Sequence, residues 1–474
     1  MPADHRIRWL EQYVDSQDLS VLEAVYGGVG SDAHRPDLLL KIALWEALEG
    51  RLSPAKWARD VREHIPLQWI SRGLQPCRTA LYNFRDRLGD VVLETHAGMV
   101  QQAIQEGLMA PQEGVMDGTS MRACASRHRA VNCSTLERRM EELQAAIALD
   151  QVGQKPATLP AWMPPTVKGR QDLSKRFVKA RETLARRLEE NARRPKDKRL
   201  EEKKVTVSTS DPEAVMGRDK EKTFTPLYTC QFVVDPESLV VLSFDVFAQA
   251  SDAGTLGPML DRTNKVIGHK LESVSTDAGY SSLLDIQECR EREVELYAPV
   301  QENAFTEKKR AARLSQRIER EQFTWLPEEE IYVCPQGHRL DYKGKERKRR
   351  YGNQEVIEHR YHCPPEHCSG CPLRERCVTN PEKGRTIKRL EGQELLDEQR
   401  AKMKTPLGEA KRKRRGQVIE RAFADAKEHR NMRKLHGRGL ERARAEVGLV
   451  VMAQTVLAIQ RLQEKRANAE KNGS

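Results

Sequence analysis

The chain has 474 residues, of which 38% are hydrophobic and 32% are charged. That length predicts two to four domains, because a domain typically holds roughly 100–200 residues. No apolar run approaches the ~20 residues of a membrane helix and the N-terminus lacks the apolar core of a signal peptide, so we expect a cytoplasmic protein without a membrane span. Lys and Arg total 81 against 70 Asp and Glu. The net charge of +11 favours a polyanionic partner, although a generic basic protein has the same balance.

Residues 1–105 are predicted to form an all-helical domain. A periodic apolar run begins at Pro36 and ends at Gly50, as expected for a helix with Pro in its first turn and Gly after its last. A later helix carries Arg85 and Arg87 beside its apolar positions. Short helices with a basic last member are typical of a helix-turn-helix-like DNA-binding module, although a helical dimerisation or packing domain has the same pattern.

The pattern changes after Glu113. The segment GVMDGTSMRA, which contains Asp117, predicts a short strand, a turn and a second strand. Residues 134–222 are predicted to be a charged insertion with antiparallel helices, in which Ser134 and Glu137 fit a capping box. A solvated charged face would have the same composition.

Strand character returns beyond the insertion. The segment PLYTCQFVVDPESLVVLSFDVF predicts a β-hairpin, because two β-rich runs flank a turn cluster at Asp235–Ser238. The elements expected next are a helix near Leu256–Val266, a strand over Leu271–Asp277, a helix over Ser282–Arg292 and a strand at Tyr297–Val300. This alternation of strands and helices indicates an α/β core built from residues 106–300 and 401–465.

The stretch 301–400, which separates the two parts of this core, is basic, rich in Cys and poor in apolar periodicity. Basic residues cluster in it at Lys343–Arg350 and beyond it at Lys411–Arg415, as in patches that contact nucleic acid. The helical pattern resumes at Gln417. Residues 466–474 are expected to form a frayed tail.

Three acidic residues of this core have the chemistry of metal ligands. Asp117 and Asp277 are placed at predicted strands, and Glu420 lies on an amphipathic helix. Brought together, their carboxylates would hold a pair of Mg²⁺ or Mn²⁺ ions, because hard cations prefer carboxylate oxygen and keep open positions for phosphate and water. Two such ions activate the attacking oxygen and stabilise the leaving one in an in-line displacement at phosphorus.

Each acid also has a purely structural interpretation. Asp117 with Gly118 forms a common turn dipeptide. Asp277 would cap the following helix, and Glu420 would be a surface ion-pair residue. Asp252, at a strand-to-helix junction, is also expected to cap a helix. No single residue separates these interpretations, so the specificity comes from the surrounding sequence.

The segments VMDGTSMRACASRHR, STDAGYSS and VIERAFADAKEHRNMRKLHGRGLERARAE resemble the three acidic motifs of bacterial insertion-sequence transposases of the DDE type. The branch that they resemble carries a Cys-rich insertion before the catalytic Glu. The run from PDLLLKIALWEALEG to TALYNFRDRLG is similar to the N-terminal transposase domain of that family. These motifs span most of the chain in the family's order.

The resemblance implies an α/β fold: a ribonuclease-H-like catalytic core with helical and Cys-rich insertions, preceded by an all-helical N-terminal domain. It implies that Asp117, Asp277 and Glu420 are the catalytic metal ligands of a DNA transposase. Such an enzyme binds double-stranded DNA at the terminal inverted repeats of its element, cleaves a strand and transfers it to target DNA. It acts on paired ends, so a homodimer or larger oligomer on DNA is implied.

Three other functions compete with this interpretation. One is a non-catalytic or domesticated DNA-binding protein, and another is a metal-dependent nuclease without strand transfer. The third is a zinc-stabilised RNA-binding protein, against which the aromatic content of only 5% argues.

Basic residues beside Glu420 are candidates for DNA contacts. Lys427 follows Glu420 by seven positions, which on a 3.6-residue period returns to the same helix face. Related transposases carry a Lys at this distance and an Arg shortly before the Glu. Here Arg415 precedes Glu420 by five positions and no Tyr lies just upstream, so the roles of Arg415 and Arg421 stay open. A solvated surface lysine is the alternative for Lys427.

Five of the ten cysteines crowd into one part of the 301–400 stretch, and His338 follows the first of them by four positions. Structural zinc favours four Cys or His ligands, often in closely spaced pairs. The predicted ligands are Cys334, Cys368, Cys371 and Cys377, with Cys363 and His338 as alternates. Because the stretch lacks the apolar residues for a core of its own, a zinc ion would stabilise it. The alternative is an unmetallated segment with reduced cysteines.

Overall fold

In this computed structural model of the protein, the structure describes residues 1–26, 34–154, 156, 158–194, 199–219, 221–300, 318–344, 347–351, 354–378 and 380–472. The chain divides into two compact units. Unit 1 comprises Met1–Thr276, Arg292–Leu296 and Lys411–Ser474, and unit 2 comprises Asp277–Glu291 and Tyr297–Ala410. Of the basic run at Lys343–Arg350, the side chains after Gly344 lie outside the described residues.

The N-terminal part of unit 1 is built from helices. Their bounds are α1 (Arg6–Asp15), α2 (Ser20–Ala24), α3 (Pro36–Leu48), α4 (Pro54–Glu63), α5 (Ile65–Ile70) and α6 (Arg78–Gln105). The helix predicted from Pro36 is present, with Pro in its first turn. The basic helix that the sequence predicted to be short is the 28-residue α6. It continues because its buried apolar positions extend from Leu81 to Val100.

A mixed sheet forms the core of unit 1. Its strands are β1 (Glu113–Arg122), β4 (Val215–Arg218), β5 (Phe224–Val234), β6 (Val241–Phe247), β7 (Ser273–Ser275) and β8 (Glu295–Tyr297, whose last residue is assigned to unit 2). They are ordered β4-β5-β1-β7-β8, and β6 also pairs with β5. Strand β1 is antiparallel to β5 and parallel to β7. The sheet therefore places β7, which directly precedes the Asp277 motif, next to the strand that carries Asp117.

The structure corrects one strand prediction and confirms another. The hairpin predicted around Asp235–Ser238 is present as antiparallel β5 and β6. The turn predicted at Asp117 and Gly118 is wrong, because β1 continues through both residues and pairs with β5 from Val115 to Arg122. Pairing along the whole strand satisfies the backbone groups that a turn would leave open.

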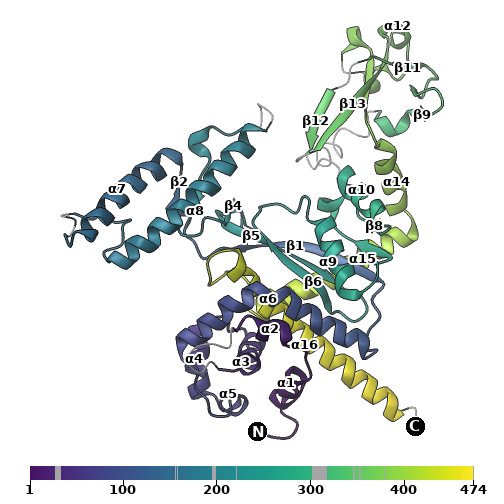
Figure 1. Cartoon of the computed structure of the whole chain (residues 1–474). Coiled ribbons are helices and arrows are strands. Elements are labelled where there is room, and N and C mark those ends of the chain that lie inside the picture. The colour runs from purple at the N-terminus through teal and green to yellow at the C-terminus, as the bar shows by residue number, and fades with distance from the viewer. Residues whose placement is uncertain are drawn as a thin grey trace. The chain divides into compact units, whose positions relative to one another are not determined.

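Helices α6, α9 (Leu256–Ile267) and α16 (Leu440–Asn472) pack against this sheet. Figure 1 shows α16 beside α6, and α16 also contacts α3 and β6. Within the described residues, α16 is the one helix long and apolar enough to cross a membrane, but 78% of its apolar window is buried inside the protein. Its apolar character thus fits a core helix. Residues 466–472 continue this helix, so the predicted frayed tail is helical up to Asn472.

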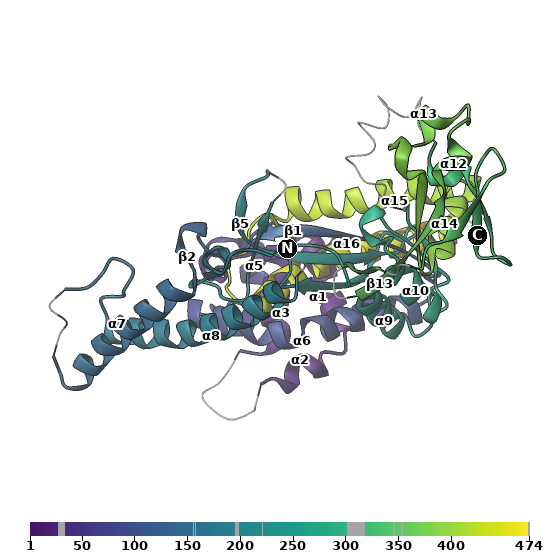
Figure 2. The same ribbon diagram turned by 90° about the horizontal axis from the view of Figure 1, so that it is seen from above.

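Two long helices, α7 (Cys133–Gln151) and α8 (Val167–Ala192), lie side by side in unit 1 (Figure 2). They pack around a buried apolar core of their own. The short elements around them are η1 (Arg127–Arg129), β2 (Ala130–Val131), η3 (Glu202–Lys204) and β3 (Val207–Ser208). The capping box predicted at Ser134 and Glu137 is wrong. The N-cap of α7 lies two residues earlier, at Asn132, whose side chain accepts from the backbone N–H of Thr135.

Unit 2 contains a second sheet and several shorter helices. Its strands are β9 (Thr324–Leu326), β10 (Ile331–Val333), β11 (Arg339–Tyr342), β12 (Arg347–Tyr351), β13 (Gln354–Cys363) and β14 (Arg385–Leu390). Its other elements are η4 (Ala278–Tyr280), α10 (Leu283–Glu291), η5 (Arg320–Gln322), α12 (Pro365–Cys368), α13 (Arg374–Cys377), η6 (Pro381–Lys383) and α14 (Gln393–Met403). The sheet is ordered β12-β13-β11-β10-β9, and β14 pairs with β13.

Unit 2 has an apolar core, contrary to the prediction that residues 301–400 lack one. Its centre is aromatic: the ring of Tyr332 lies 4.8 Å from that of Trp325 and 5.4 Å from that of Tyr361, centre to centre. Periodicity did not reveal this core because each short strand contributes only one or two apolar residues. The long helix α15 (Pro406–Ala424), which follows α14, also begins well before its predicted start at Gln417.

Candidate active site

Asp117 lies near the middle of β1, with its side chain 19% exposed. One of its carboxylate oxygens, Oδ2, accepts a hydrogen bond from Arg415 Nη2 at 2.7 Å, and the other accepts one from the backbone N–H of Gly118 at 2.7 Å. Because side chains alternate along a strand, Asp117 and Thr119 share one face of β1 while Gly118 belongs to the other. The first predicted acid is therefore accessible and held beside a cation.

The segment that carries Glu420 follows this face of β1. Arg415 contacts Asp117, and the Lys427 ammonium group donates to Thr119 Oγ1. Farther along, the backbone N–H of Leu435 donates to Arg122 O at 2.9 Å. Residues 415, 427 and 435 therefore contact β1 in the same order as positions 117, 119 and 122 follow one another along that strand. Arg415 and Lys427, two of the three basic residues predicted to lie near Glu420, thus contact β1, the strand that carries Asp117.

Lys427 reaches β1 by a route that the sequence did not predict. Helix α15 ends at Ala424, and Asp425–His429 form a π-helical turn. The 3.6-residue period therefore does not apply to the interval from Glu420 to Lys427. Turns of this kind occur frequently at functional sites, because they redirect the side chains that follow.

Glu420 itself is exposed on α15. Its carboxylate has no hydrogen bond or ion pair among the described residues, and its Oε1 lies 3.9 Å from the Cβ position of Gly416. Arg421, the next residue, is also exposed. An exposed carboxylate without a protein cation beside it is free to take a hydrated metal ion.

Asp277 is the first residue of unit 2. Its Oδ1 accepts a hydrogen bond from the backbone N–H of Gly279 at 2.7 Å, so it caps the short helix η4. The helix predicted over Ser282–Arg292 begins later, as α10 at Leu283. In the preceding β7, Ser275 pairs with Val115 of β1. Asp117 lies two residues after Val115, and Asp277 lies two residues after Ser275. The second acid thus comes directly after the strand that neighbours β1.

The opposite face of β1 holds a carboxylate that sequence reasoning had treated as a helix cap. Gln231 Nε2 donates to Asp252 Oδ1 at 2.7 Å, and both lie against Gly118. A Cβ atom at position 118 would be only 2.1 Å from this carboxylate oxygen. The glycine after Asp117 is therefore needed for close approach and not for a turn.

The cysteine cluster lies within unit 2. Its members surround a small cavity lined by Cys334, His338, Cys363, His367, Cys368, Cys371 and Cys377, together with apolar and basic side chains. The Sγ atoms of Cys363 and Cys368 are 3.9 Å apart. Two thiolates on one tetrahedral zinc, each about 2.3 Å from it, are separated by about 3.8 Å. Among the described residues, no third Cys or His ligand atom lies within 4.8 Å of both sulfurs.

Burial and the neighbouring thiols raise the pKa of Cys363 to about 12. This cysteine was predicted only as an alternate zinc ligand, yet it is 2% exposed and pairs with Cys368. His367 was not predicted at all, although its ring stacks on that of His338 with centres 5.2 Å apart. Cys363 ends β13, and His367 directly precedes Cys368 on α12. A sequence signal for both was therefore present, but spacing alone did not rank them above the other candidates.

The two arginines predicted on α6 have different surroundings. Arg85 is 4% exposed and pairs with Asp86 at 2.7 Å and with Glu446 at 3.7 Å. Arg87 is exposed, with its guanidinium 4.5 Å from the ring centre of Tyr26. A buried arginine with two acidic partners has few donors left for a phosphate, so of the two predicted arginines Arg87 stays a candidate DNA contact.

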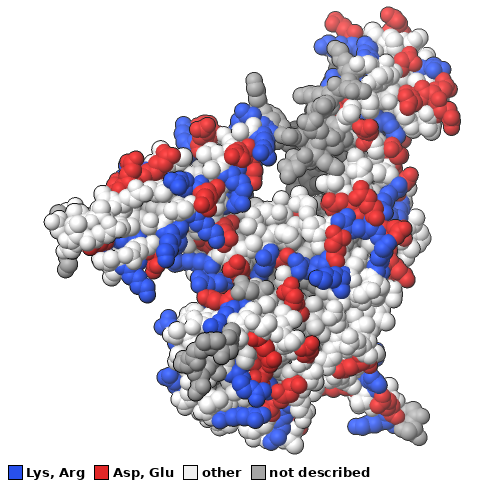
Figure 3. Space-filling model, in the orientation of Figure 1, with Lys and Arg blue, Asp and Glu red and all other residues white. Residues whose placement is uncertain are grey.

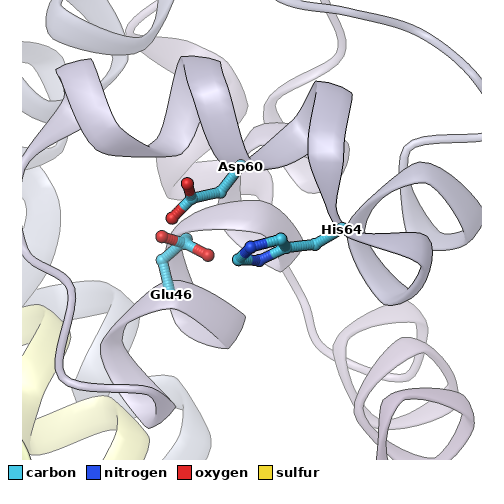
Figure 4. A group of neighbouring side chains, drawn as sticks. All are labelled: Glu46, Asp60 and His64. Carbon is cyan, nitrogen blue, oxygen red and sulfur yellow. The ribbon is translucent and has the colours of Figure 1, made fainter.

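A second acidic group lies in the N-terminal helices. Ligand atoms of Glu46, Asp60 and His64 lie within 4.8 Å of one another (Figure 4). The Arg51 guanidinium bonds Glu46 at 2.9 Å and Asp60 at 3.1 Å. Because this guanidinium already supplies the positive charge, the group is best described as a buried ion-pair network. Burial raises the pKa of Glu46 to about 7.

Two family models match the chain. The model described as transposase domain (DUF772) matches residues 1–87, which hold α1 to α5 and the start of α6. The model described as transposase DDE domain matches residues 333–459, which include Glu420, Lys427 and the cysteine cluster. No curated protein matches the sequence. These two matches, an N-terminal transposase domain and a C-terminal DDE domain in the expected order, support a DDE transposase of insertion sequences.

Proposed function

We propose that this transposase binds the ends of its insertion sequence and catalyses strand cleavage and strand transfer at two divalent metal ions. Asp117, Asp277 and Glu420 would be the metal ligands, within a ribonuclease-H-like core. The sheet order, with β6, β5, β1, β7 and β8 side by side and β7 parallel to β1, supports that core. The enzyme would act on paired DNA ends as a dimer or larger oligomer, with residues 1–105 and both insertions contributing to DNA binding.

The observation that carries the proposal is the attachment of the Glu420 segment to the strand of Asp117. Arg415 bonds Asp117 on one side of Glu420 in the chain, and Lys427 bonds Thr119 on the other. A helix that only filled space would not need two charged contacts to one face of one strand. Such contacts instead hold a carboxylate-bearing helix in register with a second carboxylate, which pre-organisation of a metal site requires.

The donor set fits Mg²⁺ or Mn²⁺, because all three proposed ligands are carboxylates. When bound, the two ions would activate the attacking oxygen and stabilise the leaving oxygen of the phosphodiester. Arg415 balances the charge of Asp117 in the protein alone. With a metal ion held by Asp117, the Arg415 guanidinium would be available to a DNA phosphate. Lys427 would hold a second phosphate beside it, and Arg421 and Arg87 are further candidate contacts.

The test is a cleavage assay on a duplex that carries the inverted repeats flanking the gene. The variants Asp117→Asn, Asp277→Asn and Glu420→Gln are each expected to lower the cleavage rate by at least ~100-fold, since even indirect metal partners contribute 10–100-fold. All three should still bind the duplex in EDTA. The matched control is Glu428→Gln, which removes an exposed carboxylate paired with Arg433 and should leave cleavage unchanged.

Strand transfer is measured separately, with a pre-cleaved end bearing a free 3′-hydroxyl and a plasmid target. Joined product that requires Mg²⁺ and Glu420 is expected. An acid variant that cleaves at the wild-type rate would remove that residue from the site. Cleavage with no joining at all would instead identify a nuclease.

We also propose that the cysteine cluster binds a structural zinc ion. Cys363 and Cys368 would supply one pair of ligands, because their sulfurs already have the spacing of a shared tetrahedral ion. The remaining ligands would come from Cys334, Cys371 and Cys377, which line the same cavity, with His338 and His367 as neighbours. Zinc would supply only structural cross-linking there.

A further inference from the structure

A pocket of about 240 Å³ lies in the helical insertion of unit 1, outside the residues assigned to catalysis. Helices α7 and α8 and the segment that precedes α8 form its walls. Its lining combines basic, aromatic and hydroxyl side chains, among them Arg129, Arg139, Trp162, Arg176, Phe177, Thr209 and Ser210. Figure 3 shows a band of Lys and Arg side chains along the lower edge of these helices.

Two arginines of the pocket lack an acidic partner. The Nε atoms of Arg139 and Arg176 are buried and make no hydrogen bond. In the part of the chain that the structure describes, neither side chain forms an ion pair, and the nearby Glu142 pairs with Arg138 instead. Burial lowers the pKa of both guanidinium groups. Both side chains are only partly exposed and their Nε–H groups are buried, so an anion bound in the pocket would compensate their desolvated charge and accept from these groups.

The aromatic wall of the pocket strengthens this requirement. The rings of Trp162 and Phe177 stack with their centres 5.9 Å apart. The Arg139 guanidinium lies 5.2 Å from the centre of the Trp162 ring, a cation–π distance that fixes its plane. An apolar wall also excludes water, and charge pairing is stronger where the local dielectric constant is low.

We propose that this pocket binds one phosphate of the DNA backbone, with Arg139 and Arg176 donating to its oxygens. The inference rests on the proposed function, which supplies DNA as the ligand. Guanidinium groups match phosphate oxygens because their N–H donors are arranged as a planar fork. A pocket lined by two such guanidinium groups, together with exposed Arg129, fits one compact anion such as a phosphate group. A flat basic surface instead suits negative charge that is spread over a larger area.

Duplex affinity in EDTA, measured by fluorescence anisotropy over a series of salt concentrations, tests the pocket without cleavage. Each neutralised phosphate contributes about 0.9 to the slope of log affinity against log salt concentration. We expect Arg139→Gln and Arg176→Gln each to lower that slope by roughly 1, and the double variant to lower it no further, because both hold the same phosphate. Arg138→Gln is the matched control, since Arg138 lies on the same helix, is exposed and pairs with Glu142.

A second measurement uses the wild-type protein, so it does not depend on how the variants fold. Phenylglyoxal modifies arginines that lack partners, and peptide mass spectrometry locates the modified residues. Arg139 and Arg176 are expected to react in the free protein and to be protected by micromolar duplex. Parallel samples with millimolar inorganic phosphate and with an acidic peptide distinguish other sources of the anion.

The outcomes separate this inference from the proposed function. Unchanged affinity and slope in the double variant, or equal loss in Arg138→Gln, would overturn the pocket while leaving cleavage intact. Protection by phosphate or by the acidic peptide but not by duplex would also overturn it. If duplex bound to the wild-type protein and protected Arg139 and Arg176 but was not cleaved, the pocket would stand and the catalytic proposal would fail.

Discussion

At the scale of single residues, the partner of a charged side chain determines what that side chain can do. Arg85 and Arg87 are the same residue type and only two positions apart. Arg85 is nevertheless buried beside two acidic residues, whereas Arg87 is exposed. The spacing between Arg415 and Glu420 left the role of Arg415 open, and the structure shows that it forms an ion pair with Asp117. Such differences come from residues distant in sequence, so no local pattern predicts them.

Lys427→Ala is expected to weaken duplex binding by the same factor for all sequences and to lower its salt slope by about 0.9, because one phosphate contact is lost. Anisotropy titrations in EDTA at several salt concentrations measure both quantities. Lys265→Ala on the exposed side of α9 is the control and should change neither. A slope equal to that of the wild type would show that Lys427 only stabilises the contact with Thr119.

The buried Glu46 predicts a pH dependence of stability. Its pKa in the folded protein, about 7, is raised from 4.5, so the fold favours the protonated form. The corresponding stability is fully present below pH ~4.5 and is lost as the pH rises through 7. The wild type should therefore lose roughly 3 kcal/mol relative to Glu46→Gln between these limits. Urea unfolding of both proteins at pH 4.5, 6 and 8 measures the difference, and a constant difference would contradict the prediction.

At the scale of elements, periodicity predicted the long apolar segments and failed at local breaks. Helices α3 and α9 and the β5–β6 hairpin begin and end close to their predicted residues, because Pro, Gly and turn clusters mark them. The continuous β1 and the π-helical turn after Ala424 were not predictable. Pairing with β5 overrides a turn dipeptide, and contact with Thr119 accompanies a local change of helical period.

The crossing of α6 and α16 predicts opposite effects for two glycine substitutions. A Cβ atom on Gly448 of α16 would lie 2.1 Å from Val92 Cγ2 and 3.0 Å from Phe244 Cζ, whereas one on Gly98 of α6 would meet nothing within 4 Å. Gly448→Ala should lower the free energy of unfolding by about 1–3 kcal/mol through overpacking. Gly98→Ala should raise it by about 0.5–1 kcal/mol through helix propensity. Denaturant unfolding measures both, and a stabilising Gly448→Ala would show that the helices can separate.

At the scale of the whole molecule, the two units have separate cores, and the cysteines of the proposed zinc site all lie in unit 2. The aromatic cluster of unit 2 shares no side chain with the sheet of unit 1 among the described residues. A unit with so small a core gains much of its stability from a bound structural ion, because metal binding is coupled to folding. Nearly all of the net positive charge belongs to unit 1, because unit 2 has 24 Lys and Arg against 23 Asp and Glu. Acidic and basic side chains alternate over most of the face in Figure 3.

Removal of zinc is expected to unfold unit 2 and to leave unit 1 folded. Elemental analysis should find one zinc per chain, which Cys363→Ser and Cys368→Ser lose and Cys124→Ser in unit 1 retains. Chelation should lower the melting temperature of one of two calorimetric transitions only. Loss of zinc from neither variant would eliminate the proposed pair, and a shift of both transitions would mean that the units unfold together.

The sequence by itself determined the class of protein, the three acidic motifs and the crowding of cysteines, because these depend on residue type and order along the chain. Tertiary structure alone decided which cation meets Asp117, how the Glu420 segment follows β1, and that Cys363 pairs with Cys368. It also brought Arg139, Trp162 and Arg176 to one pocket. The physical reason is that charge pairing, burial and ligand spacing act through space, between residues that chain order leaves far apart.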